Sequence, residues 1–332
     1  MRLAVLITLL FHLLAYGEES YYHPGEGVQV GSMPLYIGGY FSLDYQQKEE
    51  HKEFKVDDLA LLAYGDTGKF SYLAEIEASD AYVRTWNSGS SSTTDRRFHA
   101  ERLYLGYDFD DDNALKAGKY NSPIGFWNLT PINVLRDTTS SPVSTEILFP
   151  KYTSGLELSH HVYTISESSI TLMLQQTRDI DAIFNSDDVY NSFDTDRHYG
   201  VGLLHTNSAW SYQFNTGYFH TMDNETRYYL LASICYESEA FKLLSEFGVQ
   251  HDEEGFTVPY AGYVQGVYRL TPRHAGILRL ETCKDDTSHT KDTFTVLGYT
   301  YRPIYPVALK AEYQLHSLHR EDQFLVSFSV LF

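Results

Sequence analysis

The chain ends on a segment in which apolar and small side chains alternate. From Gln323 to the last residue, one face carries Phe324, Val326, Phe328, Val330 and Phe332, and the other carries Leu325, Ser327, Ser329 and Leu331. A period of two predicts a β-strand whose first face lies in apolar surroundings and whose second face is half polar. Because the strand is aromatic to its last residue, it differs from the final strand of most soluble sandwiches.

The same alternation recurs upstream in segments of about 10 to 12 residues, the length that a tilted strand needs to cross a bilayer. It is clear where Trp210, Tyr212 and Phe214 alternate with polar residues. We predict sixteen strands, at 35–45, 54–65, 69–79, 98–109, 113–121, 153–164, 168–178, 197–207, 209–221, 226–237, 240–251, 258–271, 274–285, 291–302, 306–317 and 322–332. In segment 291–302 the apolar residues change face after Val296, so we expect a bulge or a shifted boundary there.

The connections alternate between tight and long. Turn-forming residues fill the minimal connections at 65–68, 110–112, 166–167, 207–208, 238–239, 271–272 and 302–303. The longest connections are 80–97, 122–152 and 179–196. Short periplasmic turns that alternate with long outer loops are typical of bacterial outer-membrane barrels. The pattern predicts an all-β fold, a 16-stranded antiparallel transmembrane barrel over residues 35–332.

The composition and the N-terminal segment indicate export to the cell envelope. The chain has 28 Tyr and 19 Phe, and amphipathic aromatic rings favour boundaries between apolar and aqueous phases. Arg2, the apolar run 3–14 and the small residues at 15 and 17 predict a signal peptide over 1–17. Residues 18–34 are expected to form a short periplasmic segment. Of the 25 Lys and Arg, 24 remain after Arg2 is removed, against 44 Asp and Glu, a net charge of −20 that argues against nucleic acid as a partner.

Two features carry a resemblance to a family. A free C-terminal phenylalanine on a strand such as 323–332 resembles the closing strand of Gram-negative outer-membrane barrels, where it looks like the signal that the assembly machinery reads. Lys116-Ala117-Gly118-Lys119-Tyr120, then Ser122-Pro123-Ile124-Gly125, resembles the passage from strand to loop in Gram-negative porins, including the phosphate-selective O/P type. Arg136-Asp137 and Phe149-Pro150 fit the same pattern. The resemblance implies that the third outer loop, 122–152, folds inward and narrows a channel.

The loop's composition points the same way. A connection of about thirty residues is usually functional, and its many apolar side chains would be poorly placed in bulk water. We expect inward folding, with an outward surface loop as the alternative. The predicted constriction and pore-lining residues are Arg102, Lys116, Arg136, Asp137, Glu146, Glu157, Arg269, Arg279 and Lys310. Glu146 and Asp137 should face some of the wall bases across the gap, with Arg102 and Lys116 as the nearest candidates, although mutual pairing along the wall is the alternative.

The sequence contains no motif that indicates catalysis or a resident metal. HExxH, GxSxG and CxxC are absent, and the acids near Asp108 lack the glycine and closing glutamate of a calcium loop. We therefore expect no enzyme activity, no cofactor and no metal. Cys235 and Cys283 fall in separate strands and are expected to be free thiols.

These patterns predict a porin of the bacterial outer membrane, a water-filled channel for passive diffusion of ions and small hydrophilic solutes. We expect a homotrimer in contact with membrane lipid and lipopolysaccharide. The alternative is a surface adhesin or structural barrel that uses its outer loops, with the lumen blocked. The sequence does not decide between anion and cation selectivity.

Overall fold

The computed structural model describes residues 22–49, 51–86, 90–93, 98–317 and 321–332. The predicted signal peptide and the start of the segment 18–34 lie outside the described residues. Among those that are described, no helix has the length and apolar character needed to span a membrane.

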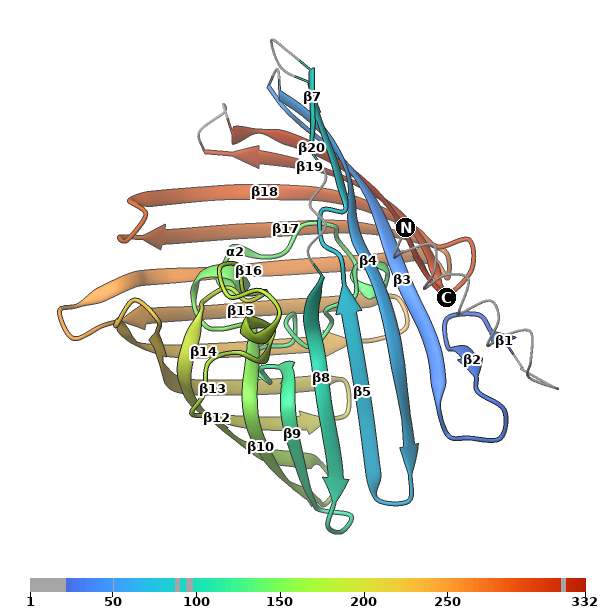
Figure 1. Cartoon of the computed structure of the whole chain (residues 1–332). Coiled ribbons are helices and arrows are strands. Elements are labelled where there is room, and N and C mark those ends of the chain that lie inside the picture. The colour runs from blue at the N-terminus through green and yellow to red at the C-terminus, as the bar shows by residue number, and fades with distance from the viewer. Residues whose placement is uncertain (1–21, 50, 87–89, 94–97, 318–320) are drawn as a thin grey trace.

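Sixteen antiparallel strands close into one barrel, as predicted (Figure 1). In chain order they are β3 (Tyr36–Lys48), β4 (His51–Thr67), β5 (Phe70–Glu77), β8 (His99–Asp108), β9 (Asn113–Asn121), β10 (Tyr152–Tyr163), β11 (Glu167–Gln175), β12 (Thr195–Asn207), β13 (Trp210–Thr221), β14 (Thr226–Glu237), β15 (Phe241–His251), β16 (Phe256–Thr271), β17 (His274–Asp285), β18 (Thr290–Tyr301), β19 (Val307–His316) and β20 (Gln323–Leu331). Each pairs with its neighbours in sequence, and β20 pairs with β3 to close the ring.

Short elements are added to this ring. β1 (Tyr22–His23) pairs with β2 (Gly27–Gln29), which pairs with β3. β6 (Tyr82–Trp86) and β7 (Ser90–Thr93) form a hairpin in the second outer loop, which the sequence did not predict. This hairpin forms because β5 ends at Glu77, so the outer part of β4 pairs with β6 instead. The helical elements are η1 (Asn133–Leu135), α2 (Val143–Ile147) and η2 (Ile180–Ile183).

The C-terminal strand completes the barrel down to the last residue. Phe332 exchanges two backbone hydrogen bonds of 2.8 Å with Gly39. A Cβ atom on Gly39 would lie 2.8 Å from the Phe332 ring, so the absence of a side chain there makes room for the terminal aromatic ring. Ser327 and Ser329 are buried on the inner face, whereas Phe324 is exposed on the outer face. The alternation read from the last ten residues is confirmed.

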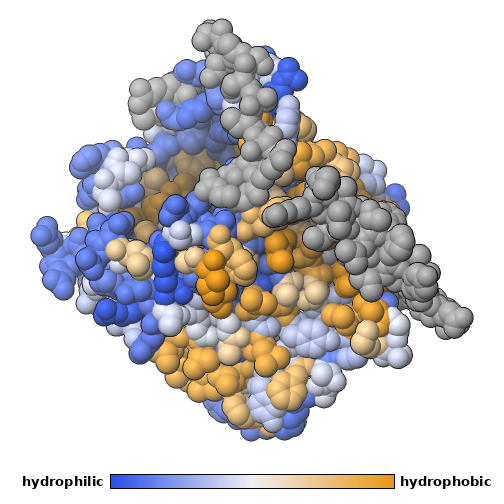
Figure 2. All heavy atoms as spheres, in the orientation of Figure 1, coloured by the Kyte–Doolittle hydropathy of each residue, from blue (hydrophilic) through white to orange (hydrophobic). Residues whose placement is uncertain are grey.

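The outer surface of the barrel is apolar and the inner surface is polar. On β13, Trp210, Tyr212 and Phe214 face outward and are about two-fifths exposed, whereas Gln213 and Asn215 are buried inside. Other exposed outward residues include Leu103, Leu105, Leu156, Leu158 and Leu172. Figure 2 shows hydrophobic residues gathered over the lower part of β9 and β10 and mostly hydrophilic residues at the outer ends of the strands on the left.

The bulge expected in the strand 291–302 is not present. β18 pairs with β17 and β19 without a register shift. Phe294 and Val296 simply face inward, while Leu297 and Tyr299 face outward. Phe294 stacks on His316, with 4.3 Å between the ring centroids. The neighbouring side chain therefore covers this inward apolar residue, and no bulge turns it outward.

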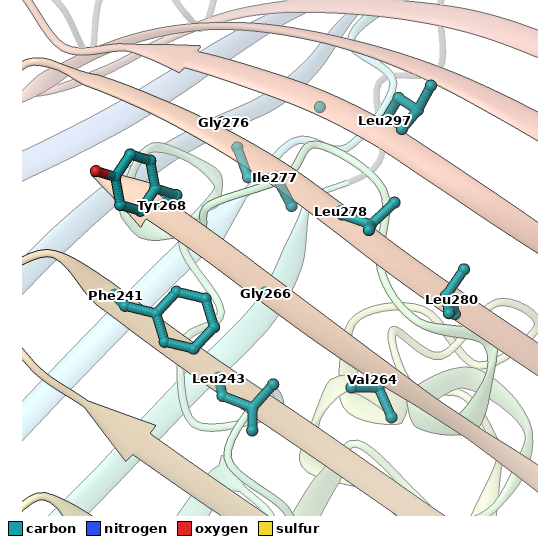
Figure 3. A pocket seen from close by; sticks show the side chains of 11 residues that line it. Phe241, Leu243, Val264, Gly266, Tyr268, Gly276, Ile277, Leu278, Leu280 and Leu297 are labelled. Carbon is teal, nitrogen blue, oxygen red and sulfur yellow. The ribbon is translucent and has the colours of Figure 1, made fainter. Parts of the chain in front are cut away.

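One groove lies on the outer face of the barrel and is distinct from the lumen. Its volume is about 600 Å³, and Figure 3 shows its lining on β15 to β18. Most lining side chains, such as Val264, Leu278 and Leu280, are exposed outward residues. Gly266 and Gly276 hollow the surface because they lack side chains. The groove therefore belongs to the apolar outer belt and not to the interior.

Charge on the outer belt should destabilise the barrel. Leu172→Arg places a guanidinium in the middle of β11 on the outward face, where it should lower the free energy of unfolding by about 2–4 kcal/mol if that face meets lipid. Reversible folding into lipid vesicles measures the change. The control Thr171→Arg puts the same charge on the inward face of the same strand and should cost clearly less; equal costs for both variants would contradict the assignment of faces.

Candidate functional site

The third outer loop, residues 122–151 and here called L3, lies inside the barrel. Figure 1 shows it in green, with α2, within the ring of strands. Its contacts follow the inner wall: Gly125 N–H donates to Asn215 on β13, α2 contacts β15 to β17, and η1 contacts β19, β20 and β3. The inward folding expected from the sequence is confirmed.

Carboxylates of the wall accept hydrogen bonds from the backbone of L3. Glu246 on β15 accepts from the N–H groups of Phe126 and Trp127, at 2.5 and 3.1 Å. Glu312 on β19 accepts from Thr139 N–H and Ser140 N–H, and Glu281 on β17 accepts from Val143 N–H. Each carboxylate therefore satisfies a backbone donor of irregular chain that no sheet ladder could satisfy.

Wall bases bind the carbonyl groups of the same loop. Arg279 donates to Ser140 O at 3.0 Å and to Thr138 Oγ1 at 3.1 Å. Lys310 donates to Asn133 O and, at 2.7 Å, to Asn133 Oδ1, while Arg302 donates to two further L3 carbonyls. Arg279 and Lys310 are 0% and 2% exposed. Their prediction as pore-lining residues is wrong, because L3 covers them and uses them as anchors.

Apolar residues of L3 fill three patches on the wall. Ile124, Leu148 and Phe149 pack with residues of β13 to β17. Ile132 and Val134 pack on a second patch on the far side, formed by Tyr40, Ala60, Leu62, Ala308 and Leu331. Trp127 packs with Leu244 and Tyr263, and the guanidinium groups of Arg136 and Arg279 each lie 5.7 Å from the Trp127 ring centroid. Burial of these side chains explains why the loop does not extend outward.

The remaining predicted pore residues lie on both sides of the lumen, but their partners differ from those expected. Lys116 pairs with Glu157 at 3.0 Å across β9 and β10, and Arg102 pairs with Glu75. On L3, Asp137 pairs with Lys242 of β15 at 3.1 Å and Glu146 with Lys151 at 2.9 Å. Asp137 therefore meets a base of the wall, as expected, but this base is Lys242 and neither Arg102 nor Lys116. That Asp137 and Glu146 face Arg102 and Lys116 across the gap stays a prediction. The alternative, mutual pairing along the wall, describes Arg102, Lys116 and Glu157.

Two further residues predicted to line the pore, Arg269 and Arg136, lie elsewhere. Arg269 binds Glu237 and the carbonyl of Ser238, at the short turn between β14 and β15. Arg136 lies on L3 itself, where its Nε donates to Thr130 O at 2.7 Å. Cys235 and Cys283 are free, as expected.

The fourth outer loop closes a gap between two strands. The β8 and β9 ladder ends at Leu103 and Lys119, which leaves the outer ends of both strands apart. Asp181, next to this gap, accepts from Ala100 N–H at 2.8 Å and contacts His99 Nδ1 at 2.8 Å. Burial alone would raise the pKa of Asp181, but hydrogen bonds from His99, Tyr190 and Ala100 lower it to about 2. Asp181 is therefore ionised at neutral pH and ties the loop to β8. Periodicity in the sequence does not reveal this role.

The inner wall also holds a group of three carboxylates that the sequence did not predict. Oxygens of Glu75, Glu77 and Glu101 lie within 4.8 Å of one another, and all three residues are buried. Glu75 and Glu77 share a face of β5 by simple alternation. Strict alternation from Arg102 would turn Glu101 outward, but a register shift opposite Glu75 and Ile76 brings it inward. The sequence carries no signal for that shift.

Comparison with known proteins identifies the fold. No family model matches the chain, and no curated protein matches it in sequence. Among solved structures, it is similar to OmpF of Salmonella typhi, with 8% identity, a TM-score of 0.62 and coverage of 95% of this chain and 100% of that one. It is also similar to the outer membrane channel DcaP of Acinetobacter baumannii, with 10% identity, a TM-score of 0.58 and coverage of 90% and 97%.

A third similar structure is OmpT of Vibrio cholerae in a trimer form, with 9% identity, a TM-score of 0.54 and coverage of 90% and 99%. The likeness to these outer-membrane proteins shows the fold, a closed 16-stranded antiparallel β-barrel, and in this chain the third outer loop lies inside the barrel.

The anchoring of L3 can be tested at one carboxylate. Glu312→Ala removes the acceptor of Thr139 N–H and Ser140 N–H and leaves both donors unpaired, which costs about 1–3 kcal/mol for a buried group. Hydrogen exchange of the 136–142 segment should accelerate by about tenfold or more. Mass spectrometry of the folded protein in detergent measures it. Glu157→Ala, a wall carboxylate paired with Lys116, should leave this segment unchanged; unchanged exchange in both variants would contradict the anchor.

Proposed function

We propose that this protein is a porin of the bacterial outer membrane, a water-filled channel for passive diffusion of ions and small hydrophilic solutes. The observation that carries the proposal is the position of L3, which is fixed against the inner wall of a 16-stranded barrel by contacts that run from β13 round to β3. Barrels of 16 to 18 strands leave an aqueous lumen. A loop that lies along the wall narrows this lumen without being a plug domain.

The strand order supports a passage between L3 and the part of the inner wall formed by β8 to β10, here called the free wall. β9 is the fifth strand of the ring and β17 the thirteenth, half a turn away. The polar anchors of L3 are concentrated on β15 to β19, whereas Arg102, Lys116 and Glu157 lie on β8 to β10. Solutes would pass between these two sides, with charged groups on both: Lys116 and Glu157 on the wall, and Asp137 and Glu146 on L3. Paired charges on a pore wall favour polar over apolar solutes.

The proposal also covers the lipid around the barrel and the oligomeric state of the protein. The apolar outer belt suits membrane lipid and, in the outer leaflet, lipopolysaccharide. A homotrimer is proposed because a similar barrel was solved in a trimer form. We assign passive transport and no enzymatic reaction. The adhesin alternative, which would use the loops 80–97 and 179–196, has less support because the longest loop folds inward and the fourth loop is tied to β8 by Asp181.

Planar-bilayer recording tests the channel directly. Folded protein should give stepwise conductance. Deletion of 126–146 removes most of L3, so the single-channel conductance should rise while the barrel still folds, as judged by heat-modifiable migration and β-type circular dichroism. An unchanged conductance in the folded deletion variant would mean that L3 does not narrow the pore, and absence of steps from the intact protein would favour a blocked barrel.

Ion preference should depend on the bases of the free wall. The double variant Arg102→Ala and Lys116→Ala leaves the partner carboxylates Glu75 and Glu157 without a neutralising charge, so the reversal potential in a salt gradient should shift toward cations. Arg269→Ala removes the same charge at the periplasmic end and should shift the potential less. A shift toward anions, or an equal shift in both, would contradict the placement of Arg102 and Lys116 at the narrow region.

A further inference from the structure

The group formed by Glu75, Glu77 and Glu101 has the construction of a cation site. Glu75 and Glu77 come from the inward face of β5, and Glu101 comes from the irregularity in β8 that turns it toward them. They are 1%, 1% and 2% exposed. Three carboxylates brought together out of water repel one another and lose hydration, so the arrangement requires positive charge in the group.

Each carboxylate has one oxygen held by a neighbour. Arg102 Nε binds Glu75 Oε2, Ser79 Oγ donates to Glu77 Oε1 at 2.6 Å, and Tyr152 Oη donates to Glu101 Oε1. Groups that hold the second oxygen of a carboxylate are typical of the outer shell around metal ligands, because they fix the orientation of the ligand atoms.

The other three oxygens lack enough donors. Tyr40 Oη lies 2.8 Å from Glu77 Oε2 and 2.9 Å from Glu101 Oε2, but a tyrosine has one proton and can donate to only one of them. Glu75 Oε1 is buried and has no hydrogen-bond partner. Because Glu75 is only 1% exposed and its carboxylate belongs to the group, this unpartnered oxygen is a second sign that a ligand is accepted here.

We propose that Glu75, Glu77 and Glu101 bind one divalent cation of the calcium type on the inner wall of the barrel. The charge fits, since three carboxylates with the guanidinium of Arg102 carry a net charge of −2 when all are ionised. The donors fit, because carboxylate and hydroxyl oxygens suit hard cations, and Ca²⁺ tolerates the irregular geometry that Mg²⁺ avoids. The bound ion would join β5 and β8 to β3 through Tyr40, and to β10 through Tyr152. This site does not depend on whether the barrel conducts.

Calcium binding by the wild-type protein is the direct test. The full mature chain, folded in detergent, is freed of metal with a chelator and titrated with ⁴⁵Ca²⁺ in about 150 mM NaCl, which screens weak surface binding. We expect saturable binding of one Ca²⁺ per chain and a higher midpoint of thermal unfolding with Ca²⁺ than with chelator. Absence of saturable binding would overturn the proposal and would mean that protons neutralise the group.

Variants locate the site. Glu77→Gln with Glu101→Gln should weaken Ca²⁺ binding by at least about 100-fold and abolish the effect of Ca²⁺ on the midpoint, because two ligands lose their charge. Tyr152→Phe removes a group that positions Glu101 and should weaken binding by about 10- to 100-fold. The control Asp292→Asn, a carboxylate on β18 bonded to His316, should bind as the wild type does.

Two outcomes with the variants decide against the site. Wild-type affinity in folded Glu77→Gln with Glu101→Gln would place the bound calcium elsewhere. An equal loss in Asp292→Asn would show a general effect of acidity rather than a built site. If the double variant does not fold, Glu75→Gln, which removes the charge of the residue with the unpartnered oxygen, takes its place with the same expected loss.

Discussion

The structure depends on one constraint: a loop without regular secondary structure lies inside a barrel, and its backbone groups must still be paired. The wall meets this constraint with acidic side chains opposite N–H groups and basic side chains opposite carbonyl oxygens. Glu246 and Glu312 accept from N–H groups, and Arg279 and Lys310 donate to carbonyl oxygens. Several of these side chains bind two groups of the loop, so a few residues can hold thirty residues of loop in place.

This constraint divides the charged residues of the interior into two groups. Those under L3 serve its backbone and are removed from solvent. Others, such as Lys116 on β9 and Glu157 on β10, keep some exposure and pair with each other across neighbouring strands. The acidic net charge of the chain is therefore a poor guide to ion preference, because much of the interior charge is covered or paired.

The free wall also shows how a small irregularity in one strand changes its chemistry. At the register shift in β8, Glu101 and Arg102 are successive residues that both contribute to the interior. The shift brings a third carboxylate to two that alternation had already placed together. The ladder between β8 and β9 also stops just below this level, and Asp181 of the fourth loop is bonded there. Irregular pairing and side-chain chemistry therefore coincide at one place on the wall.

The sequence by itself determined the barrel, because strand alternation, strand length and tight turns are local properties of a chain. The period of two around Trp210 and Phe328 placed side chains on the correct faces, and the length and apolar content of L3 indicated that it folds inward. Only the tertiary structure decided which wall charges L3 covers, so Arg279 and Lys310 proved to be anchors rather than pore residues. It also decided that Glu101 joins Glu75 and Glu77. Both outcomes depend on contacts between segments far apart in sequence, and a single residue of register, which no local pattern records, reverses the face of a side chain.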